Sequence, residues 1–274
     1  MAKELRRLLI NPERLRAAAG QGQPRLAIND GEAHYLRRVL RLGRGDRVAV
    51  VDGQGRLWSA ELAGDGTLEL QQPLAAPLHQ QPAPQPQLLL AMAVPRRDGE
   101  LVWRMATEIG VDVLQPLVAA FSQVGGQGGT QGRETWPLDR WSTIVQEATE
   151  QCERLWLPRL EPPWHALEWL GAPPEGLGLI ATTRQEGLPR LEELLARALS
   201  PRPDNPAPAT MISLAIGPEG GWSERELAVA QAAGWRAVSL GEAILRTSTA
   251  AIAGVSRLAS WRALSCASCP SPSP

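Results

Sequence analysis

The stretch from Met211 to Leu258 decides the fold of this chain and reads MISLAIGPEGGWSERELAVAQAAGWRAVSLGEAILRTSTAAIAGVSRL. It opens with Met211–Ile216, a short apolar run that ends at a glycine, which is typical of a buried strand. Gly217–Gly221 predicts an irregular turn, because its three glycines permit positive φ and close approach of the backbone. Ser223 is expected to begin the next helix, since Glu226 three residues later completes a capping box.

The second half of the stretch repeats this order of strand, loop and helix. Arg236–Leu240 is expected to be a second short strand and Gly241–Arg246 a second loop. Thr247 or Ser248 is expected to cap a final helix that carries Ala250–Leu264. Two strands that end in loops at one edge of a parallel sheet mark the place where open α/β sheets bind ligands. The sequence therefore predicts a ligand pocket here, built largely from backbone.

Upstream of this stretch, apolar segments of strand length alternate with segments of helix length. This alternation predicts an α/β domain at residues 88–265, with a parallel sheet flanked by helices. The expected strands are Leu88–Val94, Val113–Val118 and Leu177–Ala181, and the expected helices are Gly99–Ile109, Pro137–Arg154 and Pro189–Leu199. Gly125–Gly132 predicts a flexible insertion, and residues 266–274 a disordered tail.

Residues 1–72 have a different pattern, with short strands around one small helix, which predicts a small β-barrel. The expected strands are Leu8–Ile10, Arg25–Ile28, Arg47–Asp52, Leu57–Leu62 and Thr67–Leu70, and the expected helix is Glu32–Leu40. Residues 73–87 are rich in proline and glutamine, so we expect an extended linker between two domains.

The net charge of −1 hides an asymmetry between the two ends of the chain. Residues 1–62 hold twelve Arg and Lys against seven Asp and Glu, a net charge of +5. The remainder holds sixteen against twenty-two, a net charge of −6. A basic module on an acidic body favours a polyanionic partner for the first module, and scattered surface arginines are the alternative.

Several classes of protein are not supported by the sequence. No apolar run is long enough to span a bilayer and the N-terminus lacks a signal-peptide core, so a cytoplasmic protein is expected. The three histidines lie in different segments, and the CxxC pair Cys266 and Cys269 has no second pair beside it, so no metal site is expected. Neither a P-loop nor a GxGxxG turn is present.

Two motifs together resemble the knotted SPOUT RNA methyltransferases. These are Ile216–Gly221, IGPEGG, and Leu240–Ala251, LGEAILRTSTAA. Within that group the chain resembles the bacterial family that methylates N3 of uridine 1498 in 16S rRNA. The supporting matches are Ala106–Val111, the segment Glu147–Pro158, and Arg6, Arg7, His34–Arg41, Gly45 and Asp46 of a PUA-like N-terminal barrel.

The resemblance implies a C-terminal trefoil knot, a homodimer, and S-adenosyl-L-methionine bound in a bent form. The substrate would be 16S rRNA of the small (30S) ribosomal subunit, with no membrane and no metal involved. The implied cofactor-binding residues are Thr182, Ile216, Gly217, Pro218, Gly220, Gly221, Leu240, Gly241, Ile244, Leu245 and Thr249. A Cβ at the glycines of the turn is expected to collide with the cofactor.

The resemblance also implies candidate residues for catalysis and for RNA binding. Arg246 is expected to stabilise negative charge on the uracil oxygens, and Glu219 to accept the N3 proton. The alternative for Glu219 is an electrostatic pairing with the start of the following helix. The expected phosphate-binding arginines are Arg6, Arg7, Arg37, Arg38, Arg41 and Arg154. Trp103 and Trp141 lie on two different expected helices, each at a position of the helical apolar repeat, and are expected in the core.

Three residues depart from the family pattern. Ser248 stands where the family usually has an acidic residue, Phe121 where it has arginine, and Met105 near a usual basic residue. Two alternatives therefore stay open. One is a methyltransferase of the same fold that modifies another RNA site. The other is a non-catalytic RNA-binding or ribosome assembly factor.

Overall fold

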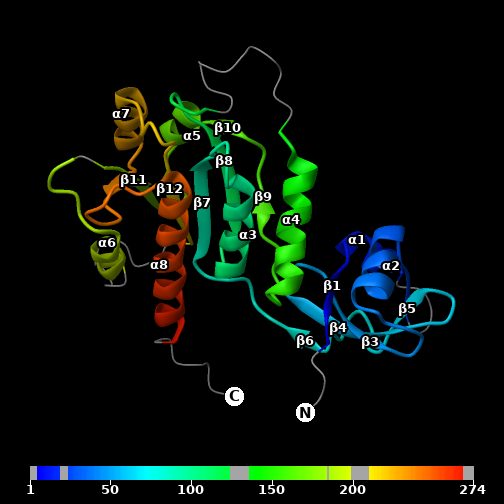
Figure 1. The fold of residues 1–274 in the computed structure, drawn as a ribbon. Coiled ribbons are helices and arrows are strands. Elements are labelled where there is room, and N and C mark those ends of the chain that lie inside the picture. Colours follow the sequence, from blue (N-terminus) through cyan, green and yellow to red (C-terminus); the bar gives the residue numbers. More distant parts are fainter. Residues whose placement is uncertain (1–4, 19–23, 124–135, 184, 199–209, 268–274) are drawn as a thin grey trace. The chain divides into compact units, whose positions relative to one another are not determined.

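The computed structural model describes residues 5–18, 24–123, 136–183, 185–198 and 210–267. The chain forms two compact units, one of residues 1–83 with 146–157, the other of residues 84–145 with 158–274 (Figure 1). The first unit extends beyond the expected boundary after residue 72 and also recruits Gln146–Leu157. The reason is apolar burial, because Leu155 packs with Leu9 and Val51 in a small separate core. The predicted insertion Gly125–Gly132 and tail 266–274 lie largely or wholly outside the described residues.

The first unit is a six-stranded sheet in which only β1 and β3 pair in parallel. Its strand order is β1-β3-β4-β5-β2, with β6 paired to β4. The strands are β1 (Arg7–Leu9), β2 (Arg25–Ala27), β3 (Arg47–Val51), β4 (Arg56–Leu62), β5 (Thr67–Leu70) and β6 (His79–Gln80). Alternate residues such as Val48, Val50 and Trp58 point into one core, which explains the five predicted strands.

The first unit differs from the sequence prediction in three elements. The helix expected at Glu32–Leu40 is instead α2 (Asp30–His34) followed by a π-helical turn, η1 (Tyr35–Val39). A further helix, α1 (Pro12–Ala17), is begun by Asn11, whose side chain accepts a hydrogen bond from a backbone N–H. Part of the expected linker at 73–87 belongs to the sheet, because β6 forms inside it by pairing with β4.

The second unit is built on a parallel sheet with the order β10-β8-β7-β12-β11-β13, and β9 also pairs with β8. Its strands are β7 (Gln87–Ala93), β8 (Val113–Val118), β9 (Arg159–Leu160), β10 (Trp164–His165), β11 (Leu177–Ala181), β12 (Met211–Ile216) and β13 (Arg236–Val238). Its helices are α3 (Gly99–Ile109), α4 (Leu138–Gln151, shared with the first unit), α5 (Ala166–Gly171), α6 (Leu191–Ala198), α7 (Glu224–Ala232) and α8 (Thr247–Ala267). The predicted parallel sheet flanked by helices is confirmed. The sequence pattern missed β9, β10 and α5, which are all short.

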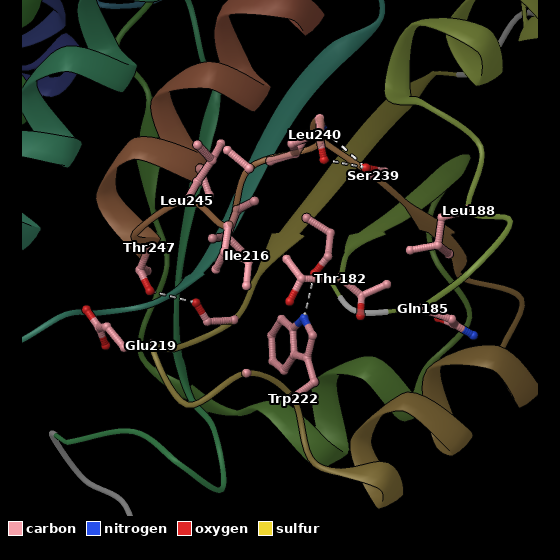
Figure 2. Close-up of a pocket in the computed structure, with 18 of the residues that line it drawn as sticks. Thr182, Gln185, Leu188, Ile216, Glu219, Trp222, Ser239, Leu240, Leu245 and Thr247 are labelled. Atoms are coloured by element: carbon pink, nitrogen blue, oxygen red, sulfur yellow. Dashed lines mark hydrogen bonds between the residues drawn. The ribbon is translucent and has the colours of Figure 1, made fainter.

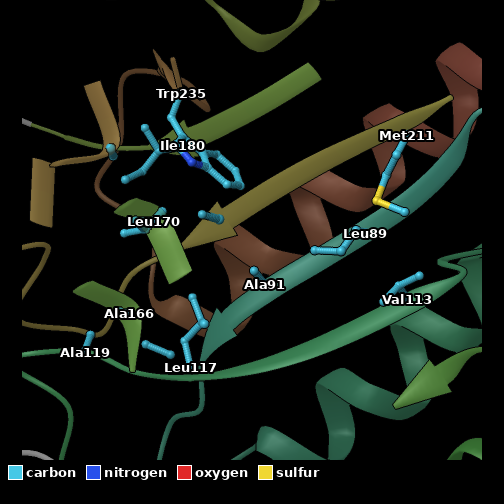
Figure 3. Packing of buried hydrophobic residues seen from close by; sticks show 13 residues of the cluster. Leu89, Ala91, Val113, Leu117, Ala119, Ala166, Leu170, Ile180, Met211 and Trp235 are labelled. Carbon is cyan, nitrogen blue, oxygen red and sulfur yellow. The ribbon is translucent and has the colours of Figure 1, made fainter. Parts of the chain in front are cut away.

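Helices cover both faces of this sheet, which is why its central strands are continuously apolar. On one face, Leu89 and Ala91 of β7 pack with Leu170 of α5 and Trp235 (Figure 3). Helices α5 and α7 pack together on that side of the sheet. Helices α3 and α8 pack against each other, and α8 also packs against β7 and β12. None of the described helices is long and apolar enough to cross a membrane.

After the edge strand β13, the C-terminal segment of the chain crosses back over the middle of the sheet. Strand β13 lies at the edge beyond β11, yet the following helix α8 packs against β7 and β12 (Figure 1). Near its other end, Arg262 pairs with Asp112 and donates a 2.7 Å hydrogen bond to the carbonyl oxygen of Gly110. The last helix therefore covers the two central strands and not the edge strand that precedes it.

Candidate functional site

The first wall of the site is the glycine turn that follows β12. Inside the turn, the N–H of Gly221 donates to the carbonyl oxygen of Pro218 at 2.8 Å. The predicted capping box then begins α7, with Ser223 and Glu226 each accepting a backbone hydrogen bond from the other. The turn is thus fixed at both ends, by the buried strand before it and by the capped helix after it.

The second wall is the loop that follows β13. The hydroxyl of Ser239 donates to the carbonyl oxygen of Gly241 at 3.0 Å and accepts from its N–H at 3.2 Å. Arg257 of α8 donates a 2.8 Å hydrogen bond to the carbonyl oxygen of Leu240. The loop therefore has a defined course although it contains no regular structure.

The third wall is the end of β11, and hydrogen bonds join it to the other two (Figure 2). The indole N–H of Trp222 donates to the carbonyl oxygen of Ala181 at 3.0 Å. The N–H of Thr182 donates to the carbonyl oxygen of Val238 at 3.1 Å. A further bond joins the first wall to the start of α8, where the hydroxyl of Thr247 donates to the carbonyl oxygen of Gly217 at 3.0 Å.

These walls enclose a pocket of about 510 Å³, within the size range of cofactor sites. Ten of the eleven predicted cofactor-binding residues line it. They are Thr182, Ile216, Gly217, Pro218, Gly220, Gly221, Leu240, Gly241, Ile244 and Leu245. The eleventh, Thr249, is exposed on α8 and is not among the lining residues.

Several lining residues were not predicted. Trp222, Gln185, Leu188, Ser239 and Thr247 all contribute to the pocket. Trp222 directly follows the glycine turn, so its position in the sequence was an available signal. Thr247 was expected only as a helix cap. Instead it is the first residue of α8, and its hydroxyl bonds to another segment rather than to its own helix.

The two candidate catalytic residues occupy different places. Glu219 lines the pocket and is exposed. The helix start that was the alternative partner for Glu219 is capped by Ser223 and Glu226. Arg246 is exposed and directly precedes α8, but it is not among the lining residues. The structure therefore places Glu219 at the pocket, and Arg246 between two lining residues, Leu245 and Thr247.

Gly220 and Gly221 are glycines for different physical reasons. A Cβ at Gly220 would lie 2.9 Å from the Cβ of Phe121, so a protein contact already explains this glycine without any cofactor. Gly221 has open space around its Cβ position but a φ of 81°, which disfavours any L side chain. A side chain at position 220 would therefore meet Phe121 as well as any ligand in the pocket that Gly220 lines.

The charged side chains among the described lining residues are Glu219 and Glu242, both acidic. Glu242 is paired with Arg190 at 3.3 Å and remains exposed. Arg190 offsets the charge of Glu242, so Glu219 is the lining carboxylate that would favour a positively charged group on a ligand. A sulfonium cofactor with an ammonium group fits this requirement. No group of three or more His, Cys, Asp or Glu among the described residues is placed to hold a metal ion.

All six arginines predicted to bind RNA belong to the first unit. Arg6, Arg37, Arg38 and Arg41 are exposed. Arg7 is half-buried and pairs with Glu153, and Arg154 is half-buried as well. Four of the six are therefore available on the surface, and Arg7 is engaged in holding its own unit together.

The remaining predictions concern single residues in the second unit. Trp103 and Trp141 are buried with ring centroids 5.8 Å apart, which confirms their place in the core. Of the three departures, Ser248 and Met105 are half-buried, and Phe121 is 55% exposed.

Comparison with known proteins agrees with this geometry. The model of the RNA methyltransferase domain matches residues 81–259, and that of the RNA methyltransferase PUA domain matches residues 28–71. The fold and the site are therefore those of an RNA methyltransferase with a PUA-like N-terminal domain.

Similarity to three known proteins identifies the family within the RNA methyltransferases. The ribosomal RNA small subunit methyltransferase E of Synechocystis is 36% identical over 249 residues, covering 89% of this chain and 74% of that protein. The protein of the same name from Mycobacterium tuberculosis is 30% identical over 235 residues, covering 82% and 83%. The crystal structure of the Neisseria gonorrhoeae enzyme bound to S-adenosyl methionine has a TM-score of 0.69 at 26% identity, covering 94% and 98%. The chain belongs to the ribosomal RNA small subunit methyltransferase E family.

Proposed function

We propose that this protein transfers a methyl group from S-adenosyl-L-methionine to N3 of uridine 1498 in 16S rRNA. The observation that carries the proposal is the three-walled pocket at the carboxyl ends of β11, β12 and β13, with ten of the implied cofactor residues around it. Membership of the family and the cofactor-bound crystal structure of the Neisseria relative support the same assignment.

The pocket residues would bind the cofactor mainly through backbone groups and apolar contacts. Ile216 and Leu245 offer apolar surface on different walls, and the glycine turn offers backbone N–H and C=O groups close to the space. Glu219 would favour the positive end of the cofactor electrostatically. When bound, the cofactor supplies a methyl group already activated on a sulfonium centre, so the protein has chiefly to align the reactants and exclude water.

The uridine has to be activated for the reaction, because its N3 carries a proton that must be removed. Glu219 is the lining carboxylate we assign to accept it, and the N3 lone pair then attacks the methyl carbon as the carbon–sulfur bond breaks. S-adenosylhomocysteine is the leaving group, so charge and atoms balance. Arg246, which lies between the lining residues Leu245 and Thr247, would stabilise the negative charge that spreads onto the uracil oxygens.

The first unit would hold the RNA. Arg6, Arg37, Arg38 and Arg41 are exposed on it and suited to phosphate contacts. The target base has to leave its stack to enter a pocket of this kind. We expect the protein to act in the cytoplasm on the small subunit, as a homodimer.

The test uses small ribosomal subunits that lack the modification. Incubation with labelled S-adenosyl-L-methionine is expected to transfer one methyl group, which mass spectrometry of rRNA fragments locates at N3 of uridine 1498. Transfer to another nucleotide or atom would assign the chain to a different RNA site. Cofactor binding without any transfer would make it an RNA-binding factor. Light scattering during size-exclusion chromatography measures the oligomeric state.

A further inference from the structure

The loop after β8 presents an exposed aromatic ring beside the pocket. Phe121 is the one phenylalanine of the chain, and 55% of its surface is exposed. Its Cβ lies 2.9 Å from the position that a Cβ of Gly220 would occupy, so the side chain stands directly against the glycine turn. Glu219, which lines the pocket, is the neighbouring residue in that turn.

The backbone on both sides of Phe121 is held in place. The N–H of Ala120 donates to Oε1 of Glu226 at 2.8 Å, and Ser122 Oγ accepts from the N–H of Ala119 at 2.9 Å. Glu226 is buried, and its Oε2 accepts from the N–H of Ser223 at 2.8 Å. One carboxylate thus ties the loop of Phe121 to the helix start that follows the glycine turn. The exposed ring is carried on fixed backbone.

We infer that Phe121 is a stacking platform for an unpaired base of the RNA substrate, and hence a positioning residue for methylation. An exposed aromatic ring on rigid backbone loses little entropy when a base stacks on it, and any base can do so. Its place beside the turn that carries Glu219 is where an extruded nucleotide or its neighbour has to pass. The inference rests on the proposed function.

The experiment compares Phe121→Ala, Phe121→Leu and Phe121→Trp in methylation of small subunits that lack the modification. Phe121→Ala is expected to raise KM for the subunit about tenfold, within the range of base–aromatic stacking, with little change in kcat. Phe121→Trp should restore KM, whereas Phe121→Leu, which keeps apolar area but no π face, should not. The matched control is Trp164→Ala, an aromatic residue 51% exposed in the same unit, which should leave KM unchanged.

Three further measurements test whether Phe121 acts through the cofactor, the fold or a protein interface. Cofactor affinity, measured by calorimetry, and melting temperature should both be unchanged in Phe121→Ala, because the ring is exposed and does not line the pocket. Loss of dimers in Phe121→Ala, seen by light scattering, would identify a protein interface and overturn the inference. An unchanged KM in Phe121→Ala, with an active wild-type protein, would overturn it too. An inactive wild-type protein would refute the proposed function itself, and the inference with it.

Discussion

The hydroxyl of Thr247 donates a 3.0 Å hydrogen bond to the carbonyl oxygen of Gly217. The bond joins the first residue of α8 to the start of the glycine turn, and both residues line the pocket. Thr247 is only 3% exposed, whereas Gly217 is half-buried, so the bond is partly buried. It couples two pocket walls that lie thirty residues apart in the chain.

Replacing Thr247 by valine should loosen this coupling. The change keeps the shape and removes the donor, so the free energy of unfolding should fall by about 1 kcal/mol and cofactor affinity should fall severalfold. Thr247→Ser keeps the hydroxyl and should retain most of the affinity. Denaturant unfolding and calorimetric titration with S-adenosyl-L-methionine measure the two effects. Equal affinity in both variants would show that the bond does not shape the pocket.

Arg246→Ala should lower the rate of methyl transfer without changing cofactor affinity. If Arg246 stabilises charge on the uracil, kcat should fall on the order of 100-fold. Cofactor affinity should hardly change, because Arg246 is not among the lining residues. Arg225→Ala on α7 is the control, since Arg225 is also exposed and not among the lining residues. Single-turnover methylation and cofactor titration provide the measurements, and normal turnover would remove Arg246 from the mechanism.

Glu219→Gln tests the proposed proton acceptor. An amide cannot take the N3 proton, so kcat should fall about 100-fold or more. Glu242→Gln is the matched control, because Glu242 is the other acidic lining residue and should affect only cofactor affinity. Steady-state methylation of the small subunit at saturating cofactor measures kcat for both variants. A kcat that falls equally in both variants would show that the loss comes from removing negative charge at the pocket and not from removing the proton acceptor.

Gly221→Ala tests the backbone of the turn. The site offers room for a methyl group, so the cost should come from φ of 81° alone, about 1–2 kcal/mol of unfolding free energy. Gly171→Ala is the control, because that site also has open space but no positive φ, and its stability should stay within about 0.5 kcal/mol. Thermal and denaturant unfolding compare the two. Equal effects would mean that the turn relaxes at little cost.

Glu150 should make the stability of the first unit depend on pH. Burial raises the pKa of this carboxyl, which accepts a 2.7 Å hydrogen bond from the N–H of Leu9, and the charges of Glu147 and Glu32 raise it further. The native state therefore holds the proton more tightly than the unfolded state. Its contribution to stability is full below the ordinary pKa of 4.5 and is lost as pH rises through the higher folded value.

Glu150→Gln keeps the acceptor oxygen and removes the titration. The difference in unfolding free energy between wild type and Glu150→Gln should therefore move against the wild type as pH rises from about 4 to 7. Glu147→Gln should reduce this change, since it removes one of the neighbouring charges. Denaturant unfolding over that pH range supplies the data. A difference that is independent of pH would contradict the raised pKa of Glu150.

Local patterns were sufficient to predict the long elements of the second unit. Gly99–Ile109, Val113–Val118, Leu177–Ala181 and Met211–Ile216 begin and end where the sequence predicts. Each is a strong apolar run or a helical repeat bounded by a glycine or a capping residue, so its limits are encoded locally. Short elements such as β6 exist only through pairing with a distant strand, and no local signal marks them.

Local sequence patterns were enough to predict the parallel sheet and the two pocket loops, and the motifs were enough to predict the family. Periodicity and turn residues act over a few neighbours, so they can be read along the chain. The tertiary structure was needed to show that Thr247 donates to Gly217 across the two walls, that Phe121 packs against Gly220, and that Glu219 but not Thr249 is among the lining residues. These facts depend on contacts between segments far apart in sequence, and packing fixes such contacts.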